Sequence, residues 1–158
     1  MSTLLDHTAV TRAIAVSVRS AAARDERARR VAESIRAGGD FDWVGIYDVL
    51  RSEIAAIGWT GTEAPAVPRF PRSKGLNGVA VASGRTVVVN DVRQDSRYLT
   101  TFERTGSEMI VPVRTSNDTI VGTIDVESPR TEAFGQPEIL FVEHCAQVLA
   151  PLWISGLK

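Results

Sequence analysis

Cysteine and histidine are scarce in this sequence, and their scarcity excludes several kinds of site. The single cysteine, Cys145, has no partner for an internal disulfide and rules out a cysteine-rich zinc site. The two histidines, His7 and His144, are too few for a three-histidine metal centre. We therefore predict neither a metal ion nor a cofactor, and we assign no catalytic residue.

The sequence also lacks an excess of positive charge and a long apolar run. It has 18 Lys and Arg against 19 Asp and Glu, a net charge of −1, whereas nucleic-acid-binding domains usually carry a basic excess. No apolar stretch approaches the roughly 20 residues that span a bilayer, and residues 1–10 lack the layout of a signal peptide. We expect a cytoplasmic protein with neither a nucleic-acid nor a membrane partner.

The 158 residues, 44% of them hydrophobic, fit a single domain over 1–158. Residues 1–40 are helical in character, and Gly38-Gly39 is expected to end the second of two helices. Residues 41–130 predict a sheet with an inserted helix and loops, and 135–154 predict a C-terminal helix.

The middle region alternates strand-like segments with loops. Strands are expected at 41–50, 53–59, 86–90, 108–114 and 119–127, a helix at 75–83, and long loops at 60–73 and 91–106. This order predicts an α+β fold of five or six antiparallel strands with helices packed on one face. The loops would cover the other face, which is a natural place for a ligand pocket.

Three acidic residues share one face of the last predicted hairpin. A four-residue loop pairs Glu108 with Asp125, and a two-residue loop pairs Glu108 with Glu127, but all three share a face in either register. The same alternation puts Val121 on this face and Ile120 on the core face. Opposed like charges are unfavourable, so water, a cation, an Arg or protonation must compensate. Either the acids form a pocket for a cationic group, such as an ammonium, or they are solvated.

The first strand places Trp43, Gly45 and Tyr47 on one face. A glycine between two aromatic residues leaves a recess for a small apolar group. The alternative is that both aromatic side chains belong to the core.

Five segments together resemble a GAF domain: DWVGIY at 42–47, RFPRSKGLNGVAVASG at 69–84, VVVNDVRQDSRY at 87–98, EMIVPVR at 108–114 and IVGTIDVESP at 120–129. The resemblance implies a six-stranded antiparallel sheet that binds small molecules beneath its covering loops. Within the superfamily the sequence is similar to free methionine-(R)-sulfoxide reductases. That likeness implies that Trp43 and Tyr47 hold the methyl end of a ligand, and that Glu108, Asp125 and Glu127 hold its polar groups.

The cysteines on which those reductases depend are missing. Their positions correspond to Val67, Asn77 and about Thr101, and Cys145 lies beside an apolar stripe of the C-terminal helix. Thiol chemistry needs a reactive thiolate, so we favour a non-catalytic sensory domain that binds an amino-acid-like or cationic ligand, with 91–106 as its lid. The alternatives are a divergent reductase-like enzyme that uses the carboxylates as acid and base, and a homodimeric interaction module without ligand.

The terminal helices carry more apolar surface than one sheet face needs. An extra stripe, formed by Phe141, Cys145, Val148 and Leu152, predicts a homodimer through these helices. Packing of all three helices within one chain is the alternative.

Overall fold

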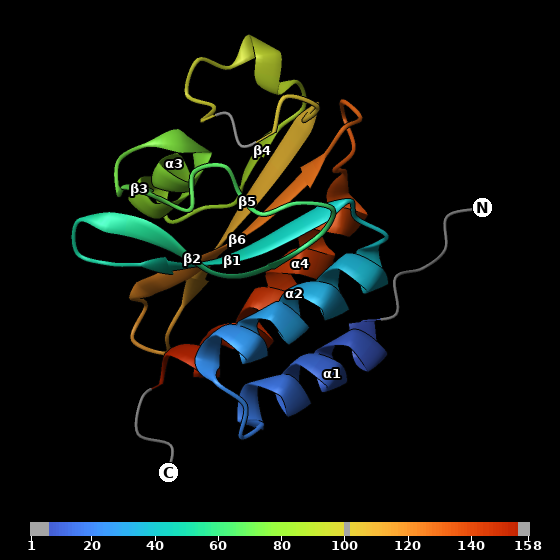
Figure 1. The fold of residues 1–158 in the computed structure, drawn as a ribbon, viewed down its shortest axis with the longest axis vertical. Helices are drawn as coiled ribbons and strands as arrows, with labels where there is room; N and C mark the ends of the chain where they lie inside the picture. Colours follow the sequence, from blue (N-terminus) through green and yellow to red (C-terminus); the bar gives the residue numbers. More distant parts are fainter. Residues whose placement is uncertain (1–6, 100–101, 155–158) are drawn as a thin grey trace.

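The protein is a six-stranded antiparallel sheet with three helices on one face (Figure 1). A computed structural model describes residues 7–99 and 102–154. The helices are α1 (His7–Arg19), α2 (Arg24–Gly39), α3 (Gly75–Ser83) and α4 (Gln136–Leu149). The strands are β1 (Trp43–Val49), β2 (Glu53–Thr60), β3 (Arg69–Pro71), β4 (Val87–Val89), β5 (Ser107–Arg114) and β6 (Ile120–Ser128). The strand order β3-β2-β1-β6-β5-β4 confirms the predicted α+β class.

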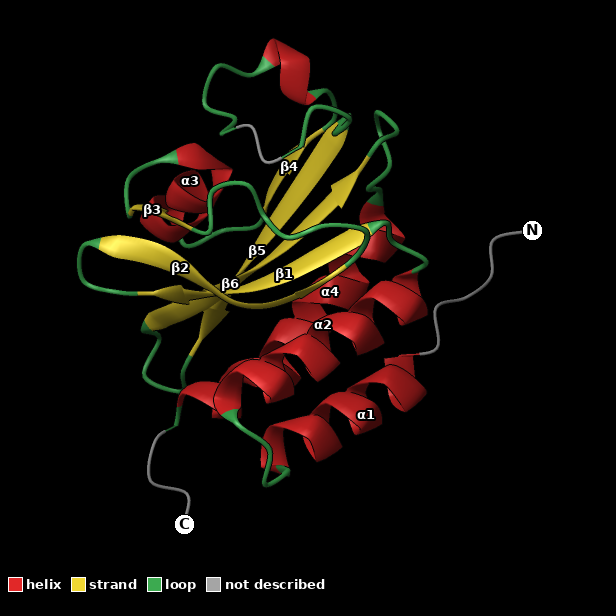
Figure 2. Ribbon diagram, in the orientation of Figure 1, coloured by secondary structure: helices red, strands yellow, loops and turns green. Residues whose placement is uncertain are grey.

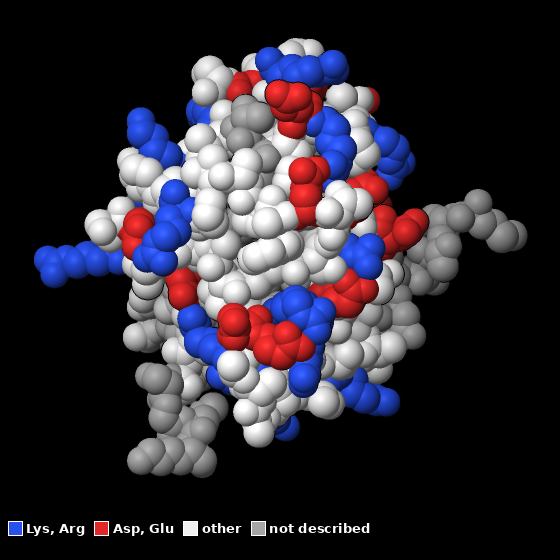
Figure 3. Space-filling view, in the orientation of Figure 1, with Lys and Arg blue, Asp and Glu red and all other residues white. Residues whose placement is uncertain are grey.

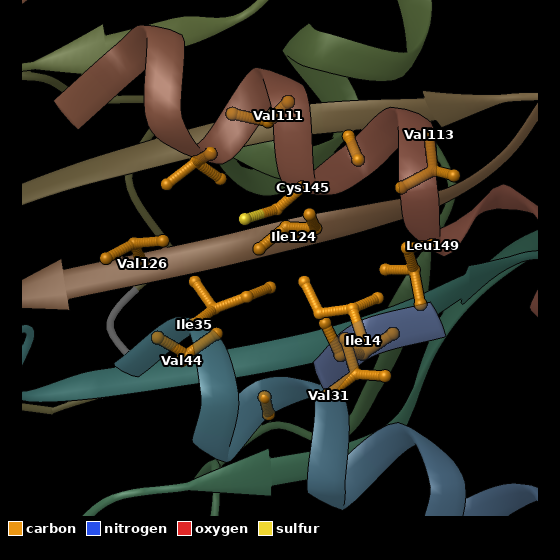
Figure 4. Packing of buried hydrophobic residues seen from close by; sticks show 14 of the residues in the cluster. Ile14, Val31, Ile35, Val44, Val111, Val113, Ile124, Val126, Cys145 and Leu149 are labelled. Carbon is orange, nitrogen blue, oxygen red and sulfur yellow. The ribbon is translucent and has the colours of Figure 1, made fainter. Parts of the chain in front are cut away.

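Helices α2 and α4 cover one face of the sheet, α1 packs against these two helices, and α3 lies over the other face with the long connecting segments (Figure 2). The main core fills the space between the sheet and the three helices. There Ile124 and Val126 of β6 meet Ile35 of α2 and Cys145 of α4, all of them 0% exposed (Figure 4). Among the described residues, no helix is long and apolar enough to cross a membrane.

One predicted boundary is wrong. The segment 60–73, predicted as a loop, contains the short strand β3, which pairs only with β2 at the sheet edge, where prolines are tolerated. Helix α2 ends at Gly39, as the Gly38-Gly39 pair predicts, and a left-handed Asp40 with φ 55° follows it. Glycine is required inside the helix because a Cβ on Gly38 would lie 2.4 Å from Cγ2 of Val10 in α1.

The β5–β6 hairpin follows the second of the two possible registers, since Glu108 lies opposite Glu127. A β-bulge near the turn changes the pairing between Val113 and Arg114. The bulge reverses the faces predicted for two residues: Ile120 packs with the aromatic side chains of the α3 side, and Val121 packs against the helix-side core. An extra residue in one strand shifts its alternation by one position, and turn composition alone does not reveal it.

The apolar stripe assigned to a dimer interface lies inside the chain. Phe141 and Cys145 are 0% exposed and Leu152 is 5% exposed, all within the helix-side core. The chain itself therefore uses this stripe, and the homodimer stays a prediction that needs another surface.

Candidate functional site

The three predicted acids lie together on the sheet face opposite the main core. Glu108 comes from β5, and Asp125 and Glu127 come from β6. Their exposed fractions are 3%, 1% and 2%, so they are not the solvated acids of the alternative interpretation. One carboxylate oxygen of each lies within 4.8 Å of the others. Such a set of oxygens suits an ammonium group or a hard metal ion.

Neutral hydrogen-bond donors surround two of the carboxylates. The Asn77 amide donates from Nδ2 to Oδ2 of Asp125 over 3.2 Å. The hydroxyls of Tyr98 and Thr105 donate to Oε1 of Glu127 over 3.1 and 3.0 Å. These donors come from α3 and from the segment 91–106, which therefore closes over the acids.

Part of the acidic cluster is left without compensation. Among residues 7–99 and 102–154, Oε2 of Glu108 and Oδ1 of Asp125 are buried and accept no hydrogen bond. No Arg or Lys in this part of the chain forms an ion pair with either residue. Buried charge without a partner is costly, so the group that offsets it must come from outside the described chain or be a proton.

Burial and mutual repulsion change the acidity of the site. Burial, reinforced by the charges of Asp125 and Glu127, raises the pKa of Glu108 well above its usual range. Burial raises the pKa of Asp125 to about 6, while hydrogen bonds from Glu108 and Asn77 act in the opposite direction. Burial and the same carboxylates also raise the pKa of Tyr47 well above its ordinary value. The burial of Glu108 and the charges of its acidic neighbours therefore favour its protonated form.

The predicted aromatic residues form the wall beside the acids. On β1, Trp43 lies opposite Glu127, and Gly45 lies opposite Asp125. Trp43 and Tyr47 are each 1% exposed. The two rings lean over Gly45 and fill the predicted recess, because a Cβ there would lie 2.4 Å from the Trp43 ring and 2.9 Å from the Tyr47 ring.

Side chains from both long loops close the aromatic wall. The Phe102 ring packs edge-on against Trp43 with ring centroids 5.3 Å apart, and Phe70 lies 6.0 Å from Tyr47. Outside them, Arg104 forms an ion pair with Glu63 and so links the two loops. The face of the sheet that carries the acids is therefore covered by side chains from three separate segments.

A small cavity remains at the centre of the site. It offers about 10 Å³ to the centre of a water-sized sphere, which is room for about one water molecule. The residues that line it come from β1, β5, β6, α3 and both loops: Tyr47, Val67, Phe70, Gly75, Leu76, Asn77, Leu99, Glu108 and Asp125. An amino-acid-sized ligand therefore fits only after the covering segments move.

The larger hollows of the described chain lie on its outer surface. The first, about 440 Å³, lies between α4 and the segment leading into β4 and contains none of the predicted site residues. Figure 3 shows charges of both signs intermingled around a broad uncharged area on one face. The buried carboxylates and the aromatic rings converge on the small cavity instead.

The predicted cysteine positions are occupied by other side chains. Val67 and Asn77 both line the central cavity, whereas Thr101 lies outside the described residues. Cys145 lies on the opposite side of the sheet, and burial raises the pKa of its thiol to about 12. The thiol is therefore neither at the site nor reactive at neutral pH.

Sequence reasoning missed several polar neighbours of the acids. Asn77 was seen only as a missing cysteine, although it contacts Asp125 directly. Thr123 gave a usable signal, because it alternates with Asp125 on the same face of β6. Tyr98 and Thr105 gave none, since they lie in a long segment with no periodic pattern.

Comparison with known proteins adds three findings. The GAF domain family matches residues 23–151. Protein ZMO0507 of Zymomonas mobilis is 30% identical over 113 residues, which are 72% of this chain and 67% of that protein. The free methionine-R-sulfoxide reductase of Saccharomyces cerevisiae is 26% identical over 113 residues, 70% of this chain and 62% of the enzyme.

A solved structure extends the likeness to nearly the whole chain. The free methionine-R-sulfoxide reductase of Neisseria meningitidis, in complex with its substrate, superposes with a TM-score of 0.81 at 25% identity. The match covers 94% of this chain and 88% of that one.

Proposed function

This chain belongs to the GAF domain family, and we propose that it is a non-catalytic sensory member, binding a small amino-acid-like or cationic ligand between its sheet and covering loops. Glu108, Asp125 and Glu127 would neutralise the positive group of the ligand. Trp43 and Tyr47 would flank its apolar part.

One observation carries this proposal: three carboxylates are buried together, and two of them lack a cationic partner. Such an arrangement costs several kcal/mol per buried charge, and apolar side chains would avoid that cost. An ammonium group supplies both a positive charge and three N–H donors, which suits the bare oxygens of Glu108 and Asp125. We infer that the chain retains these acids for a ligand rather than for stability.

The structural likeness supports an amino-acid-like ligand. The Neisseria meningitidis enzyme is a reductase of free methionine-R-sulfoxide, and its structure with its substrate has the fold of this chain. Free methionine-R-sulfoxide carries an ammonium group and a short thioether-derived side chain. The acids and the aromatic wall supply complementary surfaces for those two parts.

The covering segments lie closed over the site. The segment 91–106 contacts the site through Tyr98, Phe102 and Thr105. Ligand entry requires this segment to open, a common gating arrangement.

A reductase-like enzyme is the first alternative. The fold likeness favours it, but the sequence has only one thiol, and that thiol lies in the helix-side core. A reductase here would have to use the carboxylates as acid and base with a separate reductant. Formation of methionine from its sulfoxide by the purified protein, with dithiothreitol as reductant, would favour this alternative.

A homodimeric interaction module is the second alternative. The small central cavity favours it, because nothing larger than about one water fits there as the loops lie. Val16 of α1 and Leu140 of α4 are 67% and 55% exposed and offer apolar surface on the terminal helices for a second copy. Dimerisation and ligand binding are compatible, and we propose both for this chain.

Thermal denaturation across a ligand panel tests the proposal. The panel contains amino acids, methionine sulfoxide, nucleotides, cyclic nucleotides, CaCl₂ and MgCl₂. A ligand that binds only the folded state raises Tm, by an amount equivalent to about 2.7 kcal/mol at a concentration 100 times Kd. We expect an amino-acid-like compound to stabilise the wild type and to have no effect on Asp125→Asn.

Glu143→Gln is the matched control, because Glu143 lies on α4, on the far side of the sheet. It should respond to the same compound as the wild type does. Stabilisation by CaCl₂ or MgCl₂ in place of an amine would overturn the predicted ligand class. A wild type that responds to no compound would favour the interaction module.

A further inference from the structure

Two neutral polar side chains lie behind Asp125 and form a chain of hydrogen bonds. Asn77 lies in the first turn of α3 and is 5% exposed, and Thr123 of β6 is 0% exposed. The Thr123 hydroxyl donates to Oδ1 of Asn77 over 2.6 Å, and Nδ2 of Asn77 donates to Oδ2 of Asp125 over 3.2 Å. All three groups are shielded from solvent, where such bonds are strongest.

This chain fixes the orientation of the Asn77 amide. Oδ1 of the amide accepts a hydrogen bond from the Thr123 hydroxyl, and the NH₂ end of the amide faces Asp125. Next to Asn77, the backbone of α3 packs closely against the chain that leads into it, since a Cβ on Gly78 would lie 2.6 Å from the carbonyl carbon of Ser73. A donor is thus held against one particular carboxylate.

The other groups around Asp125 are acids or phenols. Glu108 faces it from β5, Glu127 from β6 and Tyr47 from β1, and α3 contributes the neutral amide of Asn77. Asp125 therefore accepts a hydrogen bond from a neutral amide, which does not titrate. Glu108 has no such donor among the described residues, and its Oε2 is bare. The three carboxylates are consequently not equivalent.

We propose that Asn77 is a positioning residue that keeps Asp125 ionised while Glu108 carries the proton, so that Asp125 is the charge that a cationic ligand meets. The meeting of Asp125 with a cationic ligand rests on the proposed function, whereas the division of charge between the two carboxyl groups does not. In this role an amide at the position of a reductase cysteine supplies a hydrogen bond instead of a nucleophile.

The acidity of the two groups agrees with this division. Burial raises the pKa of Asp125 to about 6, and hydrogen bonds from Glu108 and from Asn77 limit that rise. The pKa of Glu108 rises well above its usual range, first through burial and then through the charge of Asp125. With a pKa of about 6, Asp125 is largely charged above pH 7, and the raised pKa of Glu108 favours its protonated form.

Carbon-13 NMR of the side-chain carboxyl groups, followed against pH in the ligand-free protein, tests the assignment. In the wild type, Asp125 should titrate below Glu108. Asn77→Leu, which keeps the approximate shape and removes the donor, should raise the Asp125 midpoint by about one pH unit. Thr123→Val removes only the hydroxyl that orients the amide and should raise it by less.

Asn117→Asp is the control, because Asn117 lies in the exposed turn between β5 and β6, at the far end of the hairpin from Glu108. It should leave the Asp125 midpoint unchanged. An unchanged midpoint in folded Asn77→Leu would overturn the proposal, and so would a wild type in which Asp125 titrates above Glu108. If Asn77→Leu does not fold, Thr123→Val decides the question alone.

The experiment is independent of the ligand. If the wild type binds no compound of the panel while Asp125 responds to Asn77 as described, the proposed function fails and the division of charge stands. If an amine binds and the Asp125 midpoint does not respond to Asn77→Leu, the proposed function stands and the division of charge fails.

Discussion

At the scale of single residues, Asp125 is a group of the site whose burial lowers the stability of the fold. The carboxylate is 1% exposed and one of its oxygens is bare. Burying a charge that lacks a full set of partners is costly, and a neutral group at the same place removes that cost. An amide of the same shape keeps the acceptor that Asn77 needs.

We predict that ligand-free Asp125→Asn is more stable than the wild type by about 1–2 kcal/mol at pH 7.5. Urea unfolding measures the difference, and Glu143→Gln should lie within about 0.5 kcal/mol of the wild type. A clear loss of stability in Asp125→Asn would show that the carboxylate is a structural group, contrary to our account.

Only part of the site could be predicted at this scale. The acids Glu108, Asp125 and Glu127 were grouped by the two-residue period of their strands, and both hairpin registers considered from the sequence place them on one face. Their burial could not be predicted, because it depends on side chains such as Tyr98 and Phe102 from a segment without periodic pattern. The contact of Asn77 with Asp125 depends on where α3 lies over the sheet, which no local pattern determines.

At the scale of elements, the central strands approach their neighbours so closely that two positions accept only glycine. Gly45 of β1 lies under the rings of Trp43 and Tyr47 on the ligand face. Gly122 of β6 faces the other way, where a Cβ would lie 2.2 Å from the Trp153 ring. These positions form a matched pair on opposite faces of one sheet.

We expect Gly45→Ala and Gly122→Ala each to destabilise the protein by about 1–3 kcal/mol, because both overfill a packed site. Only Gly45→Ala displaces the aromatic wall, so only this variant should lose ligand affinity. Chemical unfolding and calorimetric titration, both at a temperature where each variant is folded, separate the two effects. Equal loss of affinity in both variants would contradict the assignment of the aromatic wall to the ligand.

The elements also show where pattern reasoning succeeds and where it stops. The segment 75–83 was predicted as a helix, and it forms α3 with the same limits. The faces of Ile120 and Val121 were reversed because a bulge follows a turn in which Asp118 has φ 66°. A bulge shifts the alternation of the residues beyond it by one position, and the composition of the turn does not specify whether a bulge forms.

At the scale of the whole molecule, two sets of acids act in opposite directions as pH changes. The exposed, Arg-paired carboxylates Glu26 and Asp95 have pKa values of about 2, held down by Arg29 and by Arg97. Their contribution to stability is lost only as pH falls below about 4. Asp125 and Glu108 have raised pKa values, so the folded state binds their protons more tightly than the unfolded state does.

We therefore predict that the ligand-free protein gains stability as pH falls from 7.5 to about 5, and loses it again below about 4. The free energy of unfolding, measured in urea at several pH values, gives this curve. Asp125→Asn should reduce the slope between pH 7.5 and 5. A wild type whose stability falls steadily from pH 7.5 to 5, with the same slope in the variant, would contradict the raised pKa of Asp125.

The central claim, that a cationic group binds at Glu108, Asp125 and Glu127, is tested most directly by calorimetric titration with two matched compounds. One is the amine that stabilises the wild type most, and the other is its analogue in which hydrogen replaces the amino group. Our account predicts that the wild type binds the amine at least about tenfold more tightly than the analogue, a difference of 1.4 kcal/mol or more, and that Asp125→Asn removes this preference. Equal affinity of the wild type for both compounds would contradict it.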